Sequence, residues 1–90
     1  MDANYENRRK RLKFQAWHRG FKEIDLILGP FADERVGDMD AVELDAFEAL
    51  LGQPDQDIYD WLCERSQPPE PLRTKVYEQI FDFSRRARGV

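Results

Sequence analysis

The sequence predicts an all-α fold, a compact bundle of five helices that forms a single domain over residues 1–90, with its core at about 4–87. Three observations predict it. Apolar residues recur at intervals of three and four, residues typical of helix ends stand where these stripes begin and stop, and no alternating strand-like run of useful length is present. Ninety residues suffice for one domain, and short amphipathic helices bury their apolar faces only against one another.

The apolar stripes place the helices at about 4–17, 21–34, 41–51, 55–66 and 71–87. The first stripe is weaker than the other four. In chain order the stripes are Tyr5, Arg9, Leu12 and Ala16; Ile24, Ile27, Leu28 and Phe31; Leu44, Phe47, Leu50 and Leu51; Ile58, Trp61 and Leu62; and Leu72, Val76, Ile80, Phe83 and Ala87.

Residues between the stripes indicate where helices start and stop. Asp40 precedes the third helix with Glu43 three positions later, which is the spacing of a capping box. Gly52 ends that helix, and Asp55 is placed to cap the fourth. The prolines within 68–71 end the fourth helix and set up the fifth.

Charge is unevenly distributed along the chain, although the net charge is only −4. Residues 1–22 have seven basic and two acidic side chains, residues 23–72 have two basic and fourteen acidic, and residues 73–90 have five basic and two acidic. Basic ends around an acidic middle predict an oriented surface that meets a partner.

Composition disfavours several functional classes. One histidine and one cysteine, Cys63, are too few for a structural zinc site, and the five isolated glycines form no phosphate-binding loop. The acidic group Asp38, Asp40, Glu43 and Asp45 lacks the spacing of a calcium loop. We therefore expect no catalytic, metal-binding or cofactor-binding residues. With no long apolar run and no possible internal disulfide, we expect a cytoplasmic bacterial protein without membrane insertion.

Two polar segments are candidates for binding. Arg8, Arg9, Lys10 and Arg11 can neutralise phosphates, or can form a solvated helix face. The segment 17–23, here called the corner, joins the first two helices.

Within the corner, Gly20 breaks the helix and Arg19 has a guanidinium suited to a carboxylate or phosphate. An Arg19–Glu23 ion pair that only fixes the corner is the simpler interpretation of that spacing. His18 is likewise interpreted as a corner residue rather than a catalyst.

The corner resembles a known family. Its Arg19-Gly20-x-x-Glu23 resembles the R-G-x-x-E signature of the succinate dehydrogenase assembly factors, the small flavinylation factors. The segments 8–31 and 47–62 are also similar to shared blocks of that family, and the similarity covers about residues 8–65.

The resemblance implies an all-α five-helix domain that binds the flavoprotein subunit of succinate dehydrogenase, and sometimes of fumarate reductase, and promotes covalent attachment of FAD to it. Attachment occurs within the flavoprotein, so FAD belongs to the client and no cofactor is held stably by this chain. The resemblance places the partner-binding residues at Arg19, Gly20 and Glu23, and we add His18, Arg8, Arg9 and Arg11 as neighbours.

We further expect a monomer that binds no nucleic acid. The alternative is a small helical nucleic-acid-binding or antitoxin-like regulatory module.

Overall fold

The computed structural model describes residues 2–87 and confirms an all-α fold, with five α-helices, two short 3₁₀ helices and no strand among these residues. In chain order the elements are α1 (Asp2–Trp17), α2 (Lys22–Arg35), η1 (Val36–Asp38), α3 (Ala41–Leu51), α4 (Asp55–Leu62), η2 (Glu70–Leu72) and α5 (Lys75–Ala87).

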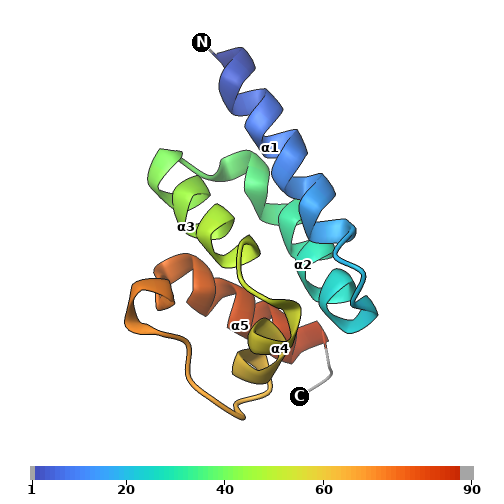
Figure 1. Cartoon of the computed structure of the whole chain (residues 1–90). Helices are drawn as coiled ribbons and strands as arrows, with labels where there is room; N and C mark the ends of the chain where they lie inside the picture. Colours follow the sequence, from blue (N-terminus) through green and yellow to red (C-terminus); the bar gives the residue numbers. More distant parts are fainter. Residues whose placement is uncertain (1, 88–90) are drawn as a thin grey trace.

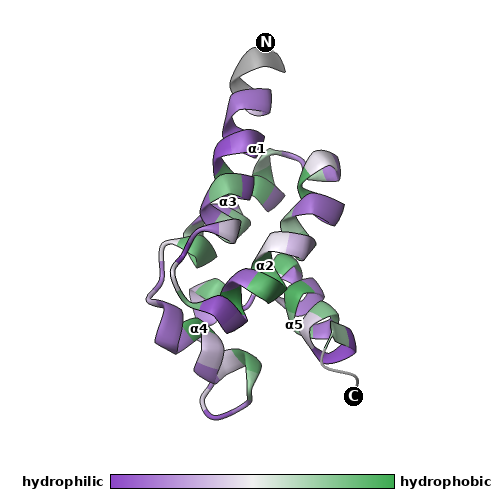
Figure 2. Ribbon diagram, turned by 90° about the vertical axis from the view of Figure 1, so that its right-hand side faces the viewer, coloured by the Kyte–Doolittle hydropathy of each residue, from purple (hydrophilic) through white to green (hydrophobic). Residues whose placement is uncertain are grey.

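The helices pack around one core (Figure 1). α1 and α2 lie side by side and are joined by the corner, α3 packs against α1, and α5 packs across α2 and α3. α4 and α5 lie at the end of the molecule away from the N-terminus of α1. The upper turns of α1 are hydrophilic and extend past the rest of the bundle (Figure 2).

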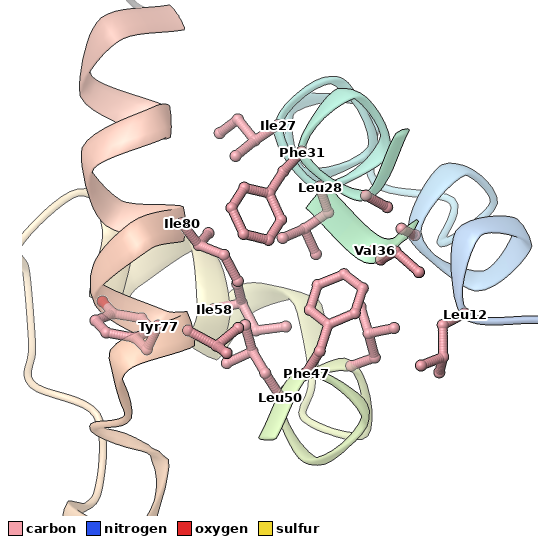
Figure 3. Close-up of a cluster of buried hydrophobic side chains, with 14 of the residues drawn as sticks. Leu12, Ile27, Leu28, Phe31, Val36, Phe47, Leu50, Ile58, Tyr77 and Ile80 are labelled. Carbon is pink, nitrogen blue, oxygen red and sulfur yellow. The ribbon is translucent and has the colours of Figure 1, made fainter. Parts of the chain in front are cut away.

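The predicted apolar stripes form the core. Phe31 of α2 packs against Phe47 of α3, with their ring centroids 5.8 Å apart, and forms a T-shaped pair with Phe83 of α5. Ile58 and Ile80 close the same cluster from α4 and α5 (Figure 3). From the weaker first stripe, Leu12 and Ala16 are fully buried. Tyr5 of that stripe is 41% exposed, and Ala87 at the end of the last stripe is also exposed, so the spacing identified the buried residues except at these two helix ends.

Two predicted boundaries are wrong, and local backbone geometry explains the first. α4 ends at Leu62 rather than 66, because Glu64 adopts a left-handed conformation with φ 64°. The amide of Arg65 donates to the carbonyl of Asp60 at 2.8 Å and that of Glu64 to Trp61 at 3.1 Å, which is a Schellman motif. A glutamate at a position that glycine usually occupies gives no sequence signal for a helix end.

The second wrong boundary is the start of α5, which begins at Lys75 rather than 71. The proline-rich segment forms η2 instead, since proline has no amide hydrogen to donate. Thr74 then caps α5 through its Oγ1, which accepts from the amide of Tyr77 at 3.1 Å. The predicted capping box of Asp40 and Glu43 is confirmed, with both hydrogen bonds at 2.9 Å. The predicted cap at Asp55 is wrong, because Pro54 is the N-cap of α4 and Asp55 is the first residue of the helix.

Candidate functional site at the corner of α1 and α2

Gly20 forms the exposed turn of the corner. Its φ of +85° lies in the left-handed region, which costs other L-residues roughly 1–2 kcal/mol. A Cβ added to Gly20 would meet no heavy atom within 4 Å, so the space in front of the backbone is open. The prediction that Gly20 breaks the helix is confirmed, and the turn presents bare main chain to the surroundings.

Arg19 is bound inside the molecule, so the predicted Arg19–Glu23 ion pair is wrong. Its Nε donates to the carboxylate of Asp55 at the start of α4. Its Nη1 and Nη2 donate to the carbonyls of Leu51 at 2.6 Å and Gln53 at 2.7 Å. The side chain is only 11% exposed. One guanidinium thus connects the corner to the α3–α4 turn.

Two further carboxylates near the corner, Asp25 and Glu23, differ in whether they bond within the chain. The main-chain amide of Arg19 donates to Asp25 Oδ1 at 3.0 Å, so the first turn of α2 reaches back to hold the corner. Glu23 is exposed, and within residues 2–87 its carboxylate forms no hydrogen bond or ion pair. Glu23 is therefore available to a partner, whereas most of the Arg19 side chain is not.

His18 stacks on Phe14, with the ring centroids 4.0 Å apart and the planes inclined by 21°. Its Nδ1 lies 2.8 Å from the carbonyl of Phe14, and because a carbonyl only accepts, Nδ1 must donate. Nε2 of the neutral ring is then a hydrogen-bond acceptor. A shallow groove of about 450 Å³ opens beside this pair. It is lined by Phe14, Gln15, His18, Arg19, Glu48, Leu51, Gly52 and Asp55.

Arg8 and Arg11 connect α1 to α3. Arg8 donates to Asp45 at 2.6 Å and to Glu48 at 3.0 Å, and the hydrogen bond with Asp45 raises the pKa of Arg8. Arg11 donates to the other oxygen of Glu48 at 2.9 Å. The interpretation of this run as a purely solvated face is wrong for Arg8. Part of the charge asymmetry is therefore neutralised within the chain.

Arg9 fastens α1 to the segment that follows α2. Its Nε donates to the carbonyl of Val36 at 3.1 Å and its Nη2 to that of Met39 at 2.7 Å. Arg8, Arg9 and Arg11 all have partners within the chain. This disfavours the alternative that the basic run binds nucleic acid, because three of its four basic side chains are already engaged. A role of these three arginines in partner binding stays a prediction.

A close contact between α1 and α2 was missed by sequence reasoning. The indole of Trp17 lies directly on Gly29, and its Nε1 donates to Asp33 at 3.1 Å. A glycine in the middle of a helix, immediately before Pro30, was the available signal for this contact.

Neither a metal centre nor a membrane span is found in the described part of the chain. No group of three or more histidine, cysteine or acidic side chains in residues 2–87 is arranged to hold a metal ion. Among the same residues no helix has the length and apolar character needed to cross a bilayer.

Comparison with known families decides the assignment. The profile of the family described as flavinator of succinate dehydrogenase matches residues 10–84, which includes the corner and reaches into α5. The chain belongs to this family. Membership in the flavinator family confirms the resemblance that the R-G-x-x-E segment indicated, and it extends the similarity beyond residue 65.

Individual relatives of this flavinator family agree. The chain is 40% identical over 88 residues to the "FAD assembly factor SdhE" of Acetobacter pasteurianus, covering 98% of this chain and 81% of that protein. It is 36% identical over 78 residues to "Succinate dehydrogenase assembly factor 2, mitochondrial" of Dictyostelium discoideum, and 34% identical over 86 residues to the Arabidopsis thaliana protein of that name. Each match covers 87% of this chain but only 55% and 46% of those mitochondrial proteins.

Proposed function

We propose that this chain is an assembly factor that binds the flavoprotein subunit of succinate dehydrogenase and promotes covalent attachment of FAD to it. The observation that carries the proposal is the family match over residues 10–84. The names of relatives in both a bacterium and eukaryotes support it, since each refers to FAD assembly or to succinate dehydrogenase assembly. Fumarate reductase is a further client in this proposal.

In this proposal the chain contributes binding and orientation, and the bond forms within the client. Holding the flavin domain in a competent conformation lowers the barrier without adding a chemical group. The FAD belongs to the client, and the chain acts as a monomer in the bacterial cytoplasm. The bacterial relative, aligned over 98% of this chain, supports a bacterial source.

The corner is well suited to such binding. Gly20 leaves the backbone open to close approach, while His18 and Glu23 are exposed on either side. Arg19 has five guanidinium N–H groups, of which three are used internally, so its main role is to hold the corner in shape. A pre-organised surface loses little conformational freedom when a partner docks.

The test is covalent flavin on the succinate dehydrogenase flavoprotein of the host, read as in-gel flavin fluorescence after denaturation. Deletion of this chain is expected to reduce the signal, and the wild-type gene to restore it. Gly20→Arg is expected to fail to restore it, because the added side chain fills the open approach. Glu23→Ala is expected to restore it only in part when the factor is limiting.

Gly37→Arg is the matched control, because Gly37 is also exposed with no heavy atom within 4 Å of an added Cβ. Gly20→Asn tests backbone strain alone, since asparagine tolerates the left-handed region. A flavin signal that persists after deletion would contradict the proposed function. A normal flavin signal with Gly20→Arg would be consistent with the proposed function but would show that the corner is not part of the binding surface.

A further inference from the structure

The outer face of α1 exposes an aromatic ring that the fold does not use for its core. Phe14 is 64% exposed, whereas Leu12 and Ala16 on the opposite side of the helix are fully buried. Lys10 and Lys13 lie four and one positions before Phe14, so the three side chains share one face. Single exposed apolar side chains are common on protein surfaces, so the significance of this ring depends on the groups around it.

This ring is held in one place before any partner arrives. It stacks on His18 at 4.0 Å, and His18 is itself fixed by the bond of Nδ1 to the carbonyl of Phe14. Fixing the ring in advance removes part of the entropy cost of burying it in a partner. Aromatic side chains in this state commonly contribute much of the binding energy of an interface.

The charges around the ring indicate the chemistry of the partner. Lys10 and Lys13 form no ion pair with any residue in 2–87, and neither does Lys22 at the start of α2. This contrasts with Arg8 and Arg11 on the α3 side of the same helix, which are paired with carboxylates. These lysines therefore carry positive charge that no carboxylate of residues 2–87 pairs, although Glu6 lies one turn before Lys10, and Glu48 and Asp55 line the groove beside Phe14.

We propose that the face formed by Lys10, Lys13, Phe14 and His18 is a docking surface, continuous with Gly20, for an acidic patch of the flavoprotein subunit that contains an apolar pocket. The ring of Phe14 enters the pocket, and the lysines lie against carboxylates around it. Nε2 of His18 accepts a hydrogen bond from the rim of that pocket. This inference rests on the proposed function, because it takes the flavoprotein subunit as the partner.

The experiment measures the dissociation constant of the purified chain with the purified flavoprotein subunit, at low and at high salt. Phe14→Ala is expected to weaken binding at least tenfold without lowering the melting temperature, because the ring lies outside the core. Val42→Ala is the matched control, since Val42 is 75% exposed on α3, and we expect no change.

The double variant Lys10→Glu with Lys13→Glu tests the charge. It is expected to weaken binding at least tenfold at low salt and much less at high salt, where surface charges are screened. Lys75→Glu on α5 is its control. If neither the Phe14 variant nor the lysine variant weakens binding, the inference is overturned. If only the lysine variant weakens binding, the part of the inference in which Phe14 enters an apolar pocket is contradicted.

These results also separate the inference from the function on which it rests. If the wild-type chain and the Phe14→Ala variant both bind the subunit and both support covalent attachment of flavin, only the proposed docking face is contradicted. A wild-type chain that neither binds the subunit nor affects its flavin contradicts both.

Discussion

Removal of the Arg19 side chain tests the internal role of the corner. The Arg19→Ala variant loses an ion pair with Asp55 and two charge-assisted hydrogen bonds to main-chain carbonyls. Hydrogen bonds from charged donors contribute about 1.5–3 kcal/mol each when partners are desolvated, and a partly exposed ion pair about 1 kcal/mol. Because Asp55 is 26% exposed and water can reach the freed groups, we expect a net loss of about 3 kcal/mol.

The assay is urea denaturation followed by tryptophan fluorescence, with thermal melting as a second measurement. A loss of about 3 kcal/mol corresponds to a decrease in melting temperature of roughly 12–24 °C for a domain of this size. Arg11→Ala is the matched control on the same helix. Its side chain is 52% exposed and has one carboxylate partner, so we expect a loss below about 1 kcal/mol.

A double-mutant cycle isolates the ion pair. Asp55→Ala also removes a negative charge from the first turn of α4, but that contribution cancels in the cycle. We expect a coupling energy of about 1 kcal/mol between Arg19 and Asp55. A coupling energy near zero, together with a loss for Arg19→Ala no larger than that of Arg11→Ala, would refute the reasoning.

The remaining predictions concern stability. Gly29→Ala places a Cβ 2.6 Å from Cε3 of Trp17, so we expect a loss of about 1–3 kcal/mol in denaturation, whereas Gly37→Ala has open space and should change little. Ser84→Ala should raise the free energy of unfolding by about 1 kcal/mol, because the buried Oγ has no hydrogen-bond partner in the described structure; a decrease would show that this hydroxyl is satisfied in solution. Burial raises the pKa of Tyr77 from 10.0 to about 12, so the unfolded state loses its proton first and stability should fall between pH 10 and pH 12. Urea denaturation of Tyr77→Phe should show a smaller decrease in the free energy of unfolding between pH 10 and pH 12 than the wild type. The same pH dependence in both proteins would contradict the burial of the phenol.

The core could be predicted from the sequence because burial follows helical periodicity, which is a local property. Phe31, Phe47 and Ile80 were identified from spacing alone and all three are fully buried. The end of α4 could not be predicted, since Glu64 takes a conformation that glycine usually adopts. Its conformation is fixed by the surrounding chain rather than by its own preference.

The corner was located correctly by Gly20, but its internal contacts were not. Arg19 and Asp55 are 36 residues apart in sequence, and nothing in local spacing distinguishes Asp55 from Glu23 as the partner. Arg8 was likewise assigned to the exterior because its partners, Asp45 and Glu48, come from a different helix. Long side chains with charged ends find partners across the fold, and a single sequence does not record which ones.

The bonds of Arg19 make the shape of the corner depend on a turn that lies far from it in the sequence. The guanidinium binds Leu51 and Gln53 at the end of α3 and Asp55 at the start of α4, so a chain in which that turn has not formed lacks the anchor of its own corner. An incompletely folded copy would therefore present Gly20 on a corner that lacks the bonds to Leu51, Gln53 and Asp55. Folding of the α3–α4 turn and the shape of the corner are thus coupled through the Arg19 side chain, so a change at Arg19 affects both.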